Sequence, residues 1–134
     1  MQITRLISIA LATVMVVSCN QQVNKEKKDI YEGKIVFKDT IRQLGLFSIA
    51  NPIQTCEFSF KNTGTVPVVI LDVRPSCKCI SVEYFQEVVP PGGYGKITVT
   101  FDGSGSQSGY FDKSVRVRIN SPQIYTLRVK GMMK

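Results

Sequence analysis

Apolar and polar residues alternate with a period of two over much of this chain, a pattern that predicts β-strands with one buried and one wet face. The alternation is clearest in four segments, each with an apolar residue at every second position. They are Cys56–Phe60, Ile97–Phe101, Val115–Ile119 and Tyr125–Val129. No segment after about residue 31 combines a helical apolar stripe with capping residues. The pattern therefore predicts an all-β domain.

Three further segments are weaker strand candidates, and turn-forming residues separate all of them. The candidates are Val36–Ile41, the nearly continuous apolar run Val66–Val73, and Ile80–Phe85. The turns are Asn62–Gly64, where both named residues tolerate positive φ, Pro90–Gly93, Gly103–Gly109 and Asn120–Pro122. About seven strands in roughly 100 residues predict an immunoglobulin-like antiparallel β-sandwich. A small closed barrel is the alternative.

The start of the chain has the pattern of a secretory signal. Arg5 precedes the apolar run Leu6–Val17, whose length of about 12 residues is short for crossing a bilayer. The Ser18–Cys19 pair that follows resembles the lipobox of bacterial lipoproteins, and this resemblance implies cleavage before Cys19 and lipidation of its thiol. Two or three acyl chains anchor a protein stably without a transmembrane helix. The alternatives are an ordinary signal peptide with an incidental cysteine, or an uncleaved short anchor.

The residues after Cys19 predict a tether. Asn20–Lys28 is polar and has no period, so we expect a signal peptide at 1–18, a lipidated cysteine and tether at 19–31, and the sandwich domain at 32–134. The amides directly after Cys19 lack the acidic run that in some Gram-negative lipoproteins resembles a surface-export signal. We therefore expect a lipid anchor in the outer membrane of a Gram-negative bacterium, with the domain facing the periplasm.

Three segments of the chain carry a family resemblance. They read FSFKNTGTVPVVILDVRPSCKC, PPGGYGKITVTFD and SGYFDKSVRVRINSPQIYTLRVKG, from about Phe58 to Gly131. In order and spacing they resemble the bacterial lipoprotein family known as domain of unknown function 1573. The resemblance implies an immunoglobulin-like sandwich and an envelope location, and no settled activity. Upstream of Phe58 the match is loose, with Leu44–Leu46 in place of the family's Phe-Gly segment.

The chain has four cysteines, one of which is the predicted lipidation site. Cys56 shares a strand face with Phe58, which predicts a buried thiol acting as a small hydrophobe. Cys77 and Cys79 lie in a predicted loop beside Arg74 and Lys78, basic residues that favour thiolates. The sequence leaves three alternatives open. The two cysteines form a structural or incidental disulfide, they have a labile redox role, or they bind a Cu(I)-like ion or are simple free thiols. Three cysteines without histidine fall short of a four-ligand zinc site, so no zinc is predicted, and the main prediction assigns no metal site.

The chain is basic, with a formal net charge of +7 and a pI near 9.4. Arg116 and Arg118 alternate outward on one predicted strand, and Arg128 and Lys130 do so on the next. If these strands pair, the four charges share a face able to bind anionic lipid headgroups, acidic glycans or an acidic protein. The alternative is a solvated face whose charges discourage aggregation. Nucleic acid is disfavoured, because exposed aromatics do not interleave with these charges.

Catalytic signals are absent from the sequence. Histidine does not occur, the ten carboxylates are scattered, and Gly103–Gly109 lacks the lysine and helix of a phosphate loop. We predict a lipid-anchored envelope protein without enzymatic activity or cofactor, which binds or scaffolds a protein or glycan partner. A thiol-redox or copper-handling protein using Cys77 and Cys79 is the alternative, and cell-surface adhesion is a third possibility.

Overall fold

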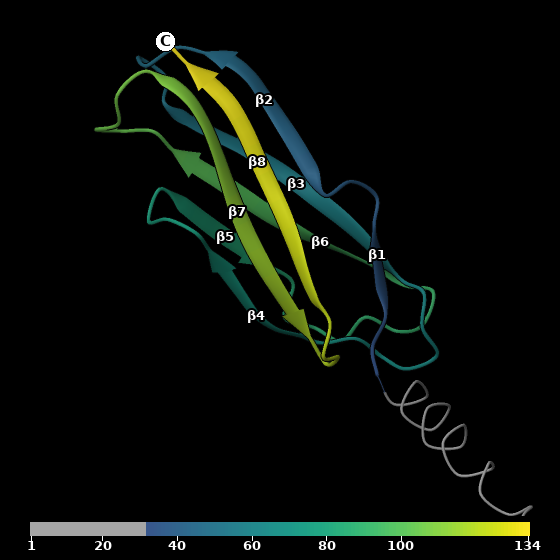
Figure 1. Cartoon of the computed structure of the whole chain (residues 1–134). Coiled ribbons are helices and arrows are strands. Elements are labelled where there is room, and N and C mark those ends of the chain that lie inside the picture. Colours follow the sequence, from purple (N-terminus) through teal and green to yellow (C-terminus); the bar gives the residue numbers. More distant parts are fainter. Residues whose placement is uncertain (1–31) are drawn as a thin grey trace, which may run out of the picture. The chain divides into compact units, whose positions relative to one another are not determined.

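The computed structural model describes residues 32–134, which fold into two four-stranded sheets packed face to face (Figure 1). Sheet A contains, in spatial order, β1 (Ile35–Phe37), β3 (Ile53–Asn62), β6 (Tyr94–Asp102) and β5 (Ile80–Tyr84). Sheet B contains β2 (Ile41–Phe47), β8 (Ile124–Met133), β7 (Gly109–Ile119) and β4 (Ile70–Pro75). The predicted all-β sandwich is confirmed, with eight strands in place of seven.

Glu32–Lys134 form one compact unit that holds all the described strands and the core. The predicted signal peptide, lipidation site Cys19 and tether lie outside the described residues. Within residues 32–134, no helix is long and apolar enough to cross a membrane. A fragment of residues 20–134 therefore contains every described strand and the core between the sheets.

The additional strand arises where the predicted segment Val36–Ile41 divides between the two sheets. β1 pairs with β3 antiparallel, whereas β2 pairs with β8 in parallel, so the sandwich is not fully antiparallel. The chain leaves sheet A after Phe37 and joins sheet B at Ile41, which interrupts the strand between them. A bulge between Gln43 and Leu46, where Gly45 has a φ of 71°, lets β2 follow β8 to its end.

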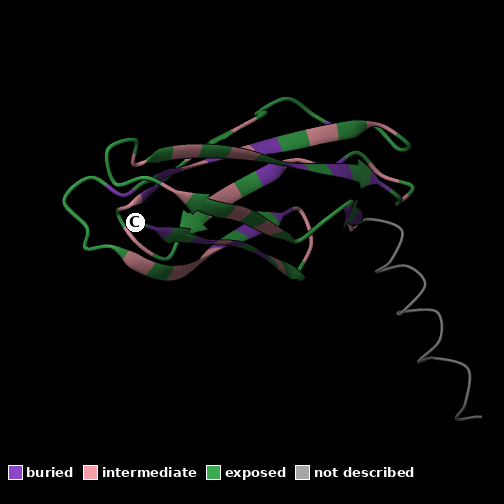
Figure 2. Cartoon of the chain, turned by 90° about the horizontal axis from the view of Figure 1, so that it is seen from above, coloured by how far each residue is buried: buried purple, intermediate pink, exposed green. Residues whose placement is uncertain are grey.

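The core lies between the sheets and follows the predicted alternation. Along the strands, buried positions alternate with exposed ones (Figure 2). Phe58, Ile97, Val115 and Leu127, one from each of the four clearest segments, are fully buried. Four segments therefore have the predicted inward face.

The predicted strand Val66–Val73 begins later than expected, at Ile70. Before it, Val68 forms a single bridge with Val89 and Pro67 has no N–H to donate. Asn62 and Asn120 bind this stretch of backbone through their side chains. Side-chain hydrogen bonds thus replace a strand ladder before β4.

The turn at Asn62–Gly64 also differs from the prediction. In the part of the chain that the structure describes, every residue with positive φ is a glycine, and Gly64 is not among them. Asn62 is instead the last residue of β3, and its side chain is fully buried. β3 and β4 lie in different sheets and do not form a hairpin. Gly92, in the predicted Pro-Pro-Gly-Gly turn, does have a positive φ of 77°.

Candidate functional site

Cys77 and Cys79 are joined by a disulfide in the short connection from β4 to β5. Their Cα atoms are 5.3 Å apart, and both side chains are half-buried against the core. Lys78 between them is exposed. Within residues 32–134, no three His, Cys, Asp or Glu side chains gather where they could hold a metal ion.

Cys56 is the free cysteine of the described residues, half-buried on the inner face of β3. It lies opposite Val99 of β6, and β6 separates β3 from β5, which follows the disulfide loop in the chain. Burial raises the pKa of its thiol, and the nearby charge of Arg42 only partly opposes this. The thiol is therefore protonated and a weak nucleophile at neutral pH.

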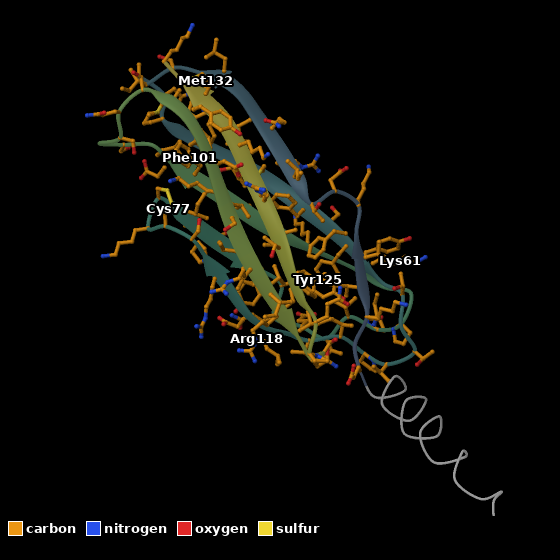
Figure 3. The ribbon with its side chains drawn as sticks, viewed as in Figure 1. Lys61, Cys77, Phe101, Arg118, Tyr125 and Met132 are labelled. Atoms are coloured by element: carbon orange, nitrogen blue, oxygen red, sulfur yellow. A yellow bond between two sulfur atoms is a disulfide. The ribbon has the colours of Figure 1, made fainter. Side chains whose placement is uncertain are left out.

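The pairing of β7 with β8 brings the four predicted basic residues onto the outer face of sheet B. The register sets Lys130 opposite Asp112, Arg128 opposite Ser114, Thr126 opposite Arg116, and Ile124 opposite Arg118. The four nevertheless fall into two groups with different surroundings. Figure 3 shows Arg118 close to the end of β7, far from Met132 at the end of β8.

The first group, Arg128 and Lys130, is paired with Asp112. Arg128 donates two hydrogen bonds to this carboxylate, from Nε to Oδ1 at 3.0 Å and from Nη2 to Oδ2 at 2.6 Å. Lys130 Nζ lies 3.4 Å from the same Oδ2. Partial burial alone would raise the pKa of Asp112, but the two cations outweigh it and hold the pKa below its ordinary value. These two predicted residues already have an anionic partner within the fold.

The second group, Arg116 and Arg118, lies against β4. Arg116 is directly opposite Arg74, and Arg118 is opposite Asp72. Arg74 donates from Nε to Asp72 Oδ2 at 2.5 Å, whereas neither Arg116 nor Arg118 has a hydrogen bond or ion pair among residues 32–134. These four residues and Ile124 line a pocket of about 110 Å³, here called the arginine pocket.

Sequence reasoning missed Arg74 and Asp72 as members of this site. It placed Arg74 beside the cysteine loop, because no local pattern indicates that β4 lies next to β7. Asp72 and Arg74 are two residues apart in a strand, so the sequence indicates that they share a face. It does not indicate that their strand pairs with β7. With three guanidinium groups and one carboxylate, the pocket attracts anions.

Residues 35–133 match the sequence family described as protein of unknown function DUF1573. The chain belongs to this family. The matched segment of DUF1573 runs from β1 to β8, and so includes both the disulfide loop and the arginine pocket. A comparison with curated proteins finds no match.

Several solved structures are similar to this DUF1573 fold. A protein of unknown function from Porphyromonas gingivalis W83 has a TM-score of 0.68 at 15% identity, over 78% of this chain and 48% of that one. The chain thus spans about half the length of that protein. A PapD-like domain of human CEP192 has a TM-score of 0.58 at 10% identity, over 95% and 96%. The Vibrio cholerae protease VesB reaches 0.56 at 13% identity, over 82% and 34%. These likenesses show a PapD-like, immunoglobulin-like fold.

Proposed function

We propose that the protein is a lipid-anchored, non-enzymatic binding or scaffolding module of the cell envelope, attached through Cys19 and docking its partner on the outer face of sheet B. The observation that carries this proposal is the pair of arginines on that face, Arg116 and Arg118, neither of which has a hydrogen bond or ion pair among residues 32–134. By contrast, Asn62 and Asn120, which lie in the segments that carry the family resemblance, use their side chains in hydrogen bonds to the backbone. The family's polar motif residues build the scaffold, and the sheet face is available for binding.

The site of chain entry agrees with an anchor at the N-terminus. Gly33 N donates to Asn120 O, and Thr63 N donates to Lys34 O, so the chain enters at the end of the sandwich where β3 and β7 end. An anchor at Cys19 attaches the domain by this end.

The anchor is tested in cells that express the full chain and are fed labelled palmitate. We expect the label in the membrane fraction, and its loss in the Cys19→Ala variant. A chain without label in both cases overturns the lipid anchor. Protease added to intact cells separates the orientations, because a periplasm-facing domain survives and a surface adhesin is degraded.

The docking face is tested with a photoreactive amino acid in place of Thr126, exposed at the centre of the outer face of sheet B. The matched control is Ser81, which is exposed on the outer face of sheet A. We expect a crosslinked adduct in intact cells from position 126 and not from position 81. Equal adducts, or none, contradict docking on sheet B.

A thiol-redox or copper-handling protein is the second candidate, favoured by the Cys77–Cys79 disulfide in a connection with an exposed Lys78. This function requires two electrons and two protons to open the disulfide reversibly, supplied by one dithiol or by two molecules of a monothiol such as reduced glutathione, which become a disulfide in turn. A reduction potential above about −300 mV, or Cu(I) retained by the reduced domain and lost in Cys77→Ser with Cys79→Ser, supports it. A potential well below that value, with no retained copper, removes it.

A further inference from the structure

We propose that the arginine pocket is a binding site for a phosphate monoester dianion. This inference rests on the proposed function, because it names the chemical group recognised on the same face of sheet B. The site consists of Arg74, Arg116 and Arg118 around the pocket, with Asp72 and Ile124 completing its wall. The sequence pattern placed Arg116 and Arg118 on one strand face, but did not indicate that Arg74 and Asp72 lie beside them.

The strand register places positive charges next to one another, and their repulsion lowers the stability of the folded sheet. Arg74 and Arg116 are directly opposed on neighbouring antiparallel strands, and Arg118 follows two residues after Arg116 on the same face. Like charges directly opposite each other on a sheet destabilise it. A bound anion between the guanidinium groups would remove this repulsion.

Elsewhere on the same sheet face, basic residues are paired with a carboxylate of the fold. Arg128 and Lys130 share the carboxylate of Asp112, with two hydrogen bonds from Arg128. In the arginine pocket the single carboxylate, Asp72, is bound to Arg74. Arg116 and Arg118 keep their full donor capacity, as no described residue accepts from them.

Size and chemistry select a phosphate group. The pocket volume of about 110 Å³ is well below the 300 Å³ or more of typical small-molecule sites, so it suits one anionic group and not a whole ligand. A phosphate monoester carries a charge of about −1.5 to −2 near pH 7, and its oxygens match the planar fork of arginine. Ile124, exposed at the rim, offers an apolar contact to the carbon that bears the ester oxygen.

The test is a titration of isotope-labelled residues 20–134 with inorganic phosphate at a fixed ionic strength of about 0.15 M, followed by NMR. We expect saturable shifts of the backbone amides of Arg74, Arg116 and Arg118. Arg116→Gln with Arg118→Gln should weaken binding by at least about tenfold, the loss expected for a charge-assisted hydrogen bond. The matched control is Arg128→Gln with Lys130→Gln, which removes equal charge from the same face and should leave the affinity within about twofold.

A vesicle arm separates the sources of the phosphate. Vesicles of phosphatidylcholine with phosphatidic acid present a phosphate monoester, and vesicles with phosphatidylglycerol present a diester. Preference for phosphatidic acid that is lost in the Arg116 and Arg118 variant assigns the group to a lipid headgroup. Binding of inorganic phosphate without vesicle binding assigns it to a free or sugar-linked phosphate. Both outcomes support the site.

Equal loss of affinity in the two double variants overturns the site, because it means that only overall charge matters. Absence of saturable shifts in the unmodified domain overturns it as well, without relying on any variant. If phosphate fails while position 126 still crosslinks in cells, the phosphate assignment is wrong and the proposed function stands. If phosphate binds while acylation and crosslinking both fail, the phosphate site stands and the proposed function is wrong.

Discussion

Asn62 and Asn120 hold the same stretch of backbone from opposite sheets. Asn62, at the end of β3 in sheet A, donates from Nδ2 to the carbonyls of Val66 at 2.9 Å and Val89 at 3.0 Å. Asn120, directly after β7 in sheet B, donates to Pro67 O at 2.9 Å and accepts from Val69 N at 3.1 Å. The crossing from β3 to β4 is thereby fixed to both layers of the sandwich.

We expect Asn62→Ala to lower the free energy of unfolding by about 3 kcal/mol, because it removes the hydrogen bonds that a fully buried amide makes to Val66 O, Val89 O and Gly64 N. Asn120→Ala should cost less, about 1 to 2 kcal/mol, because Asn120 is only half-buried and water can replace its side chain. Urea unfolding of both variants measures the difference. Equal losses would contradict the stronger role given to Asn62.

Gly95 lies against the ring of Phe60. A Cβ at this position would be 2.3 Å from Phe60 Cζ, and the ring is itself fully buried. We expect Gly95→Ala to destabilise the domain by about 2 to 3 kcal/mol through overpacking. In a double-mutant cycle with Phe60→Leu, the combined loss should be smaller than the sum of the two single losses. Additive losses would show that the two positions are not coupled.

Stability should decrease in acid partly through Asp112. Partial burial raises the pKa of this carboxyl, but the hydrogen bonds and charges of Arg128 and Lys130 exceed that effect and lower it below 3.8. As the pH falls, the unfolded chain therefore takes up a proton at this residue before the folded chain does. The stabilisation is present above about pH 4 and is lost as the pH falls through the folded pKa.

Urea unfolding at about pH 7 and about pH 3 tests this dependence. Asp112→Asn should show a smaller difference between the two pH values than the unmodified domain. Some acid sensitivity should remain, because hydrogen bonds from Ser104 lower the pKa of Asp102 as well. An unchanged difference would mean that Asp112 titrates alike in the folded and unfolded chains.

The thiols of residues 20–134 should react in a definite order. Without reduction, iodoacetamide should add once and slowly, at Cys56, since its thiol is half-buried with a raised pKa. Mild reduction should allow two further additions, at Cys77 and Cys79. Intact mass spectrometry counts the adducts. Three rapid additions to the unreduced domain would contradict the disulfide.

Cys77→Ser with Cys79→Ser should lower the free energy of unfolding by less than about 2 kcal/mol, because a disulfide that closes so short a loop restricts the unfolded chain little. Urea unfolding measures the loss, and circular dichroism confirms that the strands remain. A loss above about 3 kcal/mol would assign the disulfide a larger structural role.

The alternation of residue types determined the strands and their faces. Phe58, Ile97, Val115 and Leu127 were predicted inward and are fully buried, since successive side chains of a strand must point to opposite sides. The same rule places Cys56 inward and Arg116 outward. These properties are local, so a single segment of sequence contains them.

Tertiary structure decided which strands are neighbours. Nothing near Arg116 in the chain indicates that Arg74 lies opposite it, or that Asp112 forms ion pairs with Arg128 and Lys130. The break between β1 and β2 likewise depends on pairing with β3 and β8, far along the sequence. Cross-strand contacts arise from the packing of the whole sandwich, and the arginine pocket exists only once β4 and β7 have paired.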